Sequence, residues 1–531
     1  MKRIRFLGLA VCLVLCLLLT GCGGIWTLLG GRLVAYDRMT YARPSMTKLE
    51  QVLEESCAVA LESDSIKKVE QAIWNYYDVY DDFYTNQNLA MIAYFRDLTD
   101  SYWQAEYAYC TQYSAQVDAG LDRLYRSLAQ SPIRETLEGD DYFSADYFDS
   151  YEGESIYDDY LTGLFSQEAA LVGQYQTLWS DSSEAEYYSD AYFEEYGSQM
   201  AEVFLELVRL RQEIASYVGY DSYPEFAYDF YYGRDYTVQQ ATSYMADIRA
   251  ELVPLYRQLD ADVFNSFNTA ASEKEVLRYV QSAANAMGGT VKEAFSAMKQ
   301  AGVYDLTYSP NKYGTSFEIY LSSYQTPYIF ISPTGSTYDK LTFAHEFGHF
   351  CTDYAVPGGS MQGIHVAEIF SQGMEYLSLF YADGGEELEA ARLAMCLSTY
   401  VEQAAYASFE HQVYGLSPEE LTVEGIENLY RRVCLGYGFD ESYWDSRDYV
   451  CVPHFFEQPM YVISYVLSND AALQLYEMEQ LQAGTGLACY EANLASGQYQ
   501  LLSFLTEAGL TSPFEAGRLT QVKQTLGRIG L

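Results

Sequence analysis

Two histidines stand four residues apart in the segment Leu341–Phe350, LTFAHEFGHF, with a glutamate directly after the first. On a helix, residues four apart lie on one face, so His345 and His349 can both reach one tetrahedral metal ion. Glu346 lies beside them, where a carboxylate can take a proton from a metal-bound water. With 5 histidines among 531 residues, chance gives this pattern about 0.003 times in such a chain. The spacing therefore predicts a zinc site.

A catalytic zinc site needs a third protein ligand and a fourth position that water can occupy. Residues 364–380 are predicted to form a second amphipathic helix, on which Glu368 and Glu375 share one stripe. A solvated acidic face is the alternative, but the apolar neighbours indicate burial, where carboxylates need a metal or a hydrogen-bond donor. We predict Glu368 as the third ligand of one Zn²⁺ per chain. Glu375 is then a partner that orients a ligand histidine.

The elements around this site can be predicted from their ends. Ser336 and Asp339 read as a capping box that opens the histidine helix, and Pro357-Gly-Gly359 closes it. Before that helix, residues 314–320 alternate with a period of two and residues 327–332 form a β-rich run. These are the only strands predicted, and their edge beside the zinc helix suits an extended peptide.

These motifs resemble a known family. His-Glu-Phe-Gly-His at 345–349 and Ala-Glu-Ile-Phe-Ser-Gln-Gly-Met-Glu at 367–375 are similar to the site of the thimet oligopeptidase and oligoendopeptidase F group of zinc peptidases, where the first Glu of the second motif is the third ligand. The strand segment before the zinc helix and the segment 454–465 are also similar, and the resemblance runs from about residue 200 to residue 510. Thr352 departs from the family, which commonly carries another histidine there.

The resemblance implies a mostly α-helical fold of the thimet oligopeptidase and neurolysin type, with a deep substrate channel and a small β-sheet next to the zinc helix. It also implies that His454, Tyr461 and Tyr465 are catalytic residues that turn toward the oxyanion and the substrate backbone. The four-residue spacing of the tyrosines predicts that both lie on one helical face. Because the chain has 54 tyrosines, packing is their alternative role.

Residues 1–22 read as a bacterial lipoprotein signal, because Lys2, Arg3 and Arg5 precede an apolar run that ends in Leu-Thr-Gly-Cys22. The run is too short to cross a bilayer comfortably, and Cys22 stands where an acylated cysteine is required. A plain secretory signal or an anchor helix is the alternative. We expect the mature chain to be held by a lipid at Cys22 on the extracytoplasmic face of a bacterial cell membrane, with no other membrane attachment.

Composition and charge bound the rest of the chain. A chain of 531 residues that is 49% hydrophobic has a large core, and a formal charge of −43 makes nucleic acid an implausible partner. The seven cysteines after Cys22 show no Cys-x-x-Cys pair, which favours free thiols over disulfides. We predict a linker at 23–45, an N-terminal helical domain at 46–235 and a catalytic domain at 236–531.

The predicted function is a zinc-dependent metalloendopeptidase that hydrolyses internal bonds of short, unstructured oligopeptides outside the cytoplasm, with Glu346 activating a zinc-bound water. Two alternatives stay open: a peptide-binding or sensor lipoprotein with a vestigial metal site, and a zinc exopeptidase. The complete set of His, Glu, His and Glu argues against the first, whereas the sequence does not separate internal from terminal cleavage. His365 is interpreted as a structural or supporting residue, and His411 as a packed or surface residue.

Overall fold

The computed structural model describes residues 33–139, 143–144, 147–152, 158–182, 189–356, 362–440, 442 and 444–527. The predicted signal and the lipidation at Cys22 lie outside these residues, as does the first part of the predicted linker. Within the part of the chain that is described, no helix combines the length and the hydropathy needed to cross a bilayer.

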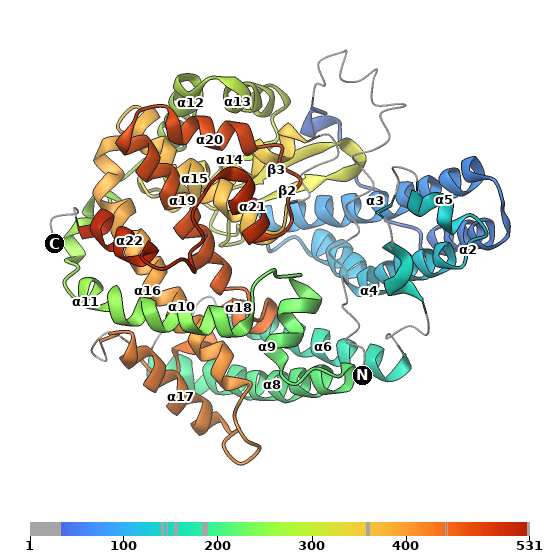
Figure 1. Cartoon of the computed structure of the whole chain (residues 1–531), viewed down its shortest axis with the longest axis horizontal. Coiled ribbons are helices and arrows are strands. Elements are labelled where there is room, and N and C mark those ends of the chain that lie inside the picture. Colours follow the sequence, from blue (N-terminus) through green and yellow to red (C-terminus); the bar gives the residue numbers. More distant parts are fainter. Residues whose placement is uncertain are drawn as a thin grey trace.

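Helices make up most of the described chain (Figure 1), and the three strands found in its described residues follow α13 and precede α14 in the sequence. The elements are α2 (Met46–Glu62), α3 (Ile66–Arg96), α4 (Ser101–Ala129), α5 (Arg134–Gly139), α6 (Asp159–Asp181), α7 (Asp190–Tyr192), α8 (Ser198–Val218), α9 (Tyr223–Phe226), α10 (Val238–Glu251), α11 (Val253–Tyr256), α12 (Glu273–Met287), α13 (Gly289–Ala301), β1 (Tyr304–Asp305), β2 (Phe317–Leu321), β3 (Thr326–Phe330), α14 (Asp339–Ala355), α15 (Ile364–Tyr381), α16 (Glu389–Val413), α17 (Val423–Gly436), α18 (Pro453–Glu457), α19 (Ile463–Leu481), α20 (Thr485–Asn493), α21 (Leu501–Ala508) and α22 (Arg518–Leu526). The prediction of a mostly α fold with a small sheet next to the zinc helix is confirmed.

Buried apolar side chains in the described chain form two clusters. The smaller one lies within residues 49–148; most of its residues are on the helices α2 to α5, which project to one side in Figure 1, and Phe143 and Phe148 follow α5. The larger one includes α6 and α8 together with the elements after residue 236, because the apolar stripe of α8 packs against aromatic side chains such as Phe409 and Phe455. The larger cluster thus includes residues on both sides of the predicted boundary between residues 235 and 236, and the division into two domains stays a prediction.

The sheet has the strand order β1-β3-β2, with β1 parallel and β2 antiparallel to β3. All five residues of β3 are buried, and β2 forms an edge that packs against α14. Both predicted strands are present with slightly shifted bounds. The prediction that they were the only strands is wrong: β1 is two residues long, too short to show a period of two in the sequence.

The histidine helix α14 begins differently from the prediction. Asp339 is its first residue rather than the third position of a capping box, and Tyr338 precedes it without a side-chain cap. The Asp339 carboxylate instead accepts hydrogen bonds from the backbone N–H groups of Thr334, Gly335 and Ser336, at 2.9, 2.8 and 3.2 Å. It thereby closes the loop between β3 and α14. The predicted closing residues 357–359 lie outside the described residues.

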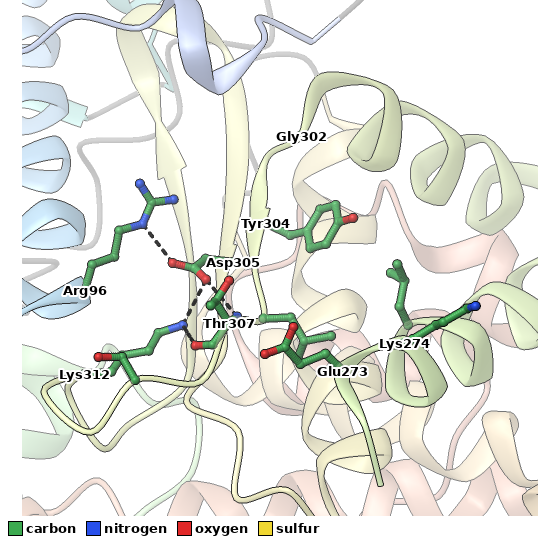
Figure 2. A pocket seen from close by; sticks show the side chains of 11 residues that line it. Arg96, Glu273, Lys274, Gly302, Tyr304, Asp305, Thr307 and Lys312 are labelled. Carbon is green, nitrogen blue, oxygen red and sulfur yellow. Dashed lines mark hydrogen bonds and ion pairs between the residues drawn. The ribbon is translucent and has the colours of Figure 1, made fainter.

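A cavity of about 760 Å³ opens beside β1, the edge strand at the other end of the sheet from β2 (Figure 2). Asp305 on β1 pairs there with Arg96 Nε at 2.8 Å and with Lys312 Nζ at 3.0 Å. The Arg96 pair ties α3 to the sheet, and the Lys312 pair ties the loop between β1 and β2 to β1. None of the site residues predicted from the sequence lines this cavity, so the candidate chemistry lies elsewhere.

Candidate metal and catalytic site

The structure brings the three predicted ligands together where α14 crosses α15. The candidate ligand atoms of His345, His349 and Glu368 all lie within 4.8 Å of one another. His345 Nε2 is 3.4 Å from Glu368 Oε2, and His349 Nε2 is 4.0 Å from Glu368 Oε1. Ligand atoms bound at about 2.0–2.2 Å around a tetrahedral zinc lie about 3.4 Å apart. Two imidazoles and one carboxylate at these separations fit a zinc ion.

A chain of contacts orients the first of these ligands. Glu375, two turns after Glu368 on α15, accepts from His345 Nδ1 at 2.7 Å, which leaves Nε2 directed at the ligand cluster. The other Glu375 oxygen lies 2.7 Å from Nε of the buried Arg392 on α16. Glu375 was predicted from the sequence, whereas Arg392 was not. No local spacing links Arg392 to the motif, because the contact exists only where α16 packs near α15.

Glu346 is buried next to the ligands and beside the edge strand β2. Burial raises the pKa of its carboxyl to about 7; the neighbouring His345 and a hydrogen bond from the Glu318 backbone oppose this rise, while Glu368 and Glu375 add to it. Its pKa thus lies near neutrality, where a general base works best. A bound cation would lower this value. Burial raises the pKa of the Glu318 carboxyl on β2, and the charges of Asp353 and Glu346 add to this rise. Glu318 was not predicted from the sequence.

The two histidines differ in their protonation. Burial lowers the pKa of His345, but the hydrogen bond to Glu375 and the charges of Glu368, Glu375 and Glu346 outweigh it, and the pKa rises to about 9. Burial lowers the pKa of His349 to about 4. In the absence of a cation, His349 is therefore neutral at neutral pH, and its Nε2 lone pair is available to a metal.

The late residues implied by the resemblance lie against the same cluster. Tyr461 Oη donates to Glu368 Oε1 at 3.1 Å, and Tyr465 Oη lies 3.1 Å from His454 Nε2. The rings of the two tyrosines are 5.1 Å apart. Burial, reinforced by the charge of Glu368, raises the pKa of both tyrosines well above its ordinary value, so both hydroxyls remain hydrogen-bond donors at neutral pH.

Tyr461 and Tyr465 do not lie on one helical face, so that prediction is wrong. Helix α19 begins at Ile463, and Tyr461 lies in the turn before it. Met460 has a φ of 66° in that turn, which interrupts the helical path between α18 and α19. The rings are neighbours because this turn folds Tyr461 back beside the first turn of α19.

The other residues considered in the sequence, His365, His411 and Thr352, make hydrogen-bond contacts within the fold. His365 is 4% exposed, and its Nε2 lies 2.7 Å from Tyr236 Oη. His411 is packed between Tyr228 Oη at 2.9 Å and its own helix, where Nδ1 lies 2.6 Å from a backbone carbonyl. Thr352 hydroxyl donates to the His349 carbonyl at 2.7 Å.

The predicted free cysteines agree with the structure. All seven cysteines from Cys57 to Cys489 lie in the described part of the chain and are free, five of them buried. Burial raises the pKa of thiols such as Cys110, to about 11, so they are poor nucleophiles and poor metal ligands at neutral pH.

Comparison with known proteins gives one family match and several structural matches. Residues 36–154 match the model of the peptidase M3 N-terminal domain. No curated protein matches this sequence. A crystal structure provisionally assigned to oligoendopeptidase F has a TM-score of 0.81 at 20% identity, over 93% of this chain and 98% of that chain.

Two further solved structures agree with that match. PZ peptidase A with an inhibitor has a TM-score of 0.80 at 19% identity, over 93% of this chain and 99% of that one. The oligoendopeptidase F of Enterococcus faecium has a TM-score of 0.55 at 16% identity, over 91% and 97%. The fold is therefore oligoendopeptidase F-like along nearly the whole chain.

Proposed function

We propose that this chain is a zinc-dependent metalloendopeptidase acting on short oligopeptides. The observation that carries the proposal is the convergence of His345, His349 and Glu368 with the buried carboxyl of Glu346. The match to a peptidase family model and the peptidase structures with this fold support it. When bound, zinc would polarise the scissile carbonyl and lower the pKa of a water molecule.

The side chains of the chain itself carry the proton transfers. Glu346 accepts the proton of the attacking water and returns it to the leaving amine. Glu375, held by Arg392, keeps His345 in the orientation that directs Nε2 at the metal position. The edge strand β2 beside α14 offers backbone groups to an extended peptide, which would place its carbonyl near Glu346.

Tyr461, Tyr465 and His454 provide hydrogen-bond donors outside the ligand set. The Tyr461 hydroxyl is within hydrogen-bonding range of Glu368, and the Tyr465 hydroxyl is within hydrogen-bonding range of the His454 imidazole. The developing oxyanion needs such donors, and groups that are already oriented cost little reorganisation as the charge develops. We assign the oxyanion role chiefly to Tyr465, whose pKa is raised in part by the nearby Glu346.

Digestion of a defined mixture of unstructured peptides, with mass spectrometry, tests the proposal. Internal cleavage should disappear after chelation and return with about one zinc ion per chain. Cleavage that survives removal of the metal would contradict a zinc mechanism. Removal of single terminal residues alone would favour an exopeptidase, and metal-dependent peptide binding without cleavage would favour a binding lipoprotein.

We also propose that the protein is anchored by a lipid at Cys22 outside the cytoplasm. The support is the sequence pattern at residues 1–22. Cys22→Ser should abolish labelling with a radioactive fatty acid in the producing cell and release the protein from the membrane fraction. A wild-type protein that keeps Met1 and carries no label would contradict the anchor.

A further inference from the structure

The turn between α18 and α19 has an unusual backbone. Met460 is one of two described non-glycine residues in the left-handed region, with a φ of 66°. A side chain there is sterically disfavoured, so surrounding contacts must hold the conformation. Tyr461 follows directly, and Tyr465 lies in the first turn of α19. The backbone at Met460 therefore decides where both hydroxyls point.

Three side chains from other segments hold this turn, and we call them the turn clamp: Tyr232, Arg234 and Glu410. Glu410 Oε1 accepts from the Met460 N–H at 2.6 Å, and Arg234 Nη2 donates to the Met460 carbonyl at 2.7 Å. Tyr232 Oη donates to the carbonyl of Pro459 at 2.9 Å. Both polar groups of Met460 and the carbonyl before it are thus bound by side chains.

The clamp is itself rigidly placed. The Arg234 guanidinium carbon lies 4.1 Å from the ring centre of Tyr228 and 4.4 Å from that of Tyr232. Its Nη2 also reaches Ser464 Oγ at 3.2 Å, directly before Tyr465. Glu410 is 2% exposed on α16. Stacking and burial leave these groups little freedom, so they impose their geometry on the turn.

The preceding helix is held in the same way. Arg211 on α8 is 1% exposed, donates from Nη1 to the Phe455 carbonyl at 2.8 Å, and also bonds the Phe456 carbonyl. These carbonyls belong to α18, which carries His454. The segment that presents His454, Tyr461 and Tyr465 is thus fixed by arginines from outside it.

We propose that Tyr232, Arg234 and Glu410 are positioning residues for peptide hydrolysis, which hold the Met460 turn so that Tyr461 and Tyr465 face the metal site. The kinetic consequence rests on the proposed peptidase function. The geometric consequence is independent of that function, because it concerns only how firmly the backbone of the Met460 turn is held.

Kinetics of four variants test the kinetic consequence. Arg234→Gln should lower kcat about 10- to 100-fold with little change in KM, because displaced donors are missed mainly in the transition state. Tyr232→Phe removes one hydroxyl and little volume, so it should fold and show a smaller fall of the same kind. Glu410→Gln keeps an acceptor for the Met460 N–H and should stay near wild type, whereas Glu410→Met should resemble Arg234→Gln.

A double-mutant cycle separates positioning from general damage. In a Tyr465→Phe background, Arg234→Gln should have a smaller effect than in wild type, since the part that acts through the Tyr465 hydroxyl is already lost and only the part that acts through Tyr461 remains. Arg518→Gln is the control, because Arg518 is a buried arginine that pairs with Asp470 at 2.8 Å and does not contact the Met460 turn. Its effect should remain in the Tyr465→Phe background. Additive effects of Arg234→Gln would overturn the proposal.

Hydrogen exchange gives a readout that needs no activity. Amides in residues 457–466 of the metal-free protein should exchange faster in Arg234→Gln and Tyr232→Phe than in wild type and Arg518→Gln. Unchanged exchange in that segment would overturn the inference, whatever the protein cleaves. If exchange is faster in these two variants but the wild-type protein cleaves no peptide, the positioning role of the turn clamp is supported and the peptidase proposal is rejected.

Discussion

Glu346 is the proposed general base, because its buried carboxyl lies beside the three candidate ligands. Glu346→Gln keeps the size of the side chain and removes the proton acceptor. We expect the variant to retain about one zinc per chain while kcat falls by several orders of magnitude. Metal analysis and peptide turnover check this together. His349→Ala should lose the metal as well, and an active Glu346→Gln enzyme would show that the base is a different group.

Tyr465 differs from a packing tyrosine in facing His454 and the ligand cluster. Tyr465→Phe should lower kcat about 10- to 1000-fold with little change in KM, since the lost donor acts mainly on the oxyanion. Tyr476→Phe on the same helix is the matched control, because its hydroxyl bonds Glu389 instead, at 2.8 Å. Equal turnover of the two variants would assign Tyr465 to packing.

Glu410 gives a pH dependence of stability that is independent of the metal. Burial raises its pKa from 4.5 to about 8, while the Met460 N–H, Arg234 and Arg211 oppose this rise. The folded state then binds a proton that the unfolded state has released, so this carboxyl lowers stability as pH rises from about 4.5 to 8, by up to about 1.4 kcal/mol per pH unit.

Glu410→Gln removes this titration. Urea unfolding of the metal-free variant should therefore show a stability gain over wild type that grows between pH 5 and pH 8. A difference between the two proteins that is constant over this range would show that the pKa of Glu410 is close to its ordinary value.

At the scale of elements, the crossing of α14 and α15 brings the candidate metal ligands together. Gly348 lies between the two histidines, and a Cβ there would stand 2.6 Å from both the Phe370 carbonyl oxygen and the Ser371 Cα. Because backbone atoms cannot give way as a side chain would, Gly348→Ala must push the helices apart and separate the histidines from Glu368.

We expect Gly348→Ala to destabilise the fold by about 1–3 kcal/mol and to weaken zinc binding. Thermal unfolding and competition with a zinc indicator measure the two effects. Gly163→Ala on α6 is the control, since a Cβ there meets nothing within 4 Å and alanine favours the helix. Unchanged zinc affinity in Gly348→Ala would mean that the crossing relaxes without moving the ligands.

At the scale of the whole molecule, the fold agrees with a peptidase of short substrates. We expect a channel between two helical halves that would admit an extended peptide along β2, whereas a folded domain would first have to unfold. Unfolding costs about 5–15 kcal/mol, and the sequence has no nucleotide-binding loop to supply it. We therefore expect cleavage of unstructured peptides and negligible cleavage of folded proteins. Incubation with a stable protein and with its tryptic peptides checks this, and similar cleavage of both would indicate an open cleft.

The sequence by itself determined the local chemistry. The four-residue spacing of His345 and His349 predicts a shared helical face, and the apolar surroundings of Glu368 predict a buried carboxylate, since both depend on residues within a few turns. The helical class follows from the same short-range patterns. The two-residue strand β1 was missed because it is too short to have a period.

Only the tertiary structure decided how distant segments meet. The ion pair of Arg392 with Glu375 and the turn clamp on Met460 join residues that share no spacing in the sequence. Tyr461 reaches Tyr465 through a left-handed backbone at Met460 that no propensity predicts, because a non-glycine residue adopts it only when surrounding contacts hold it there. Such contacts depend on packing between elements, which a single sequence does not encode in any local pattern.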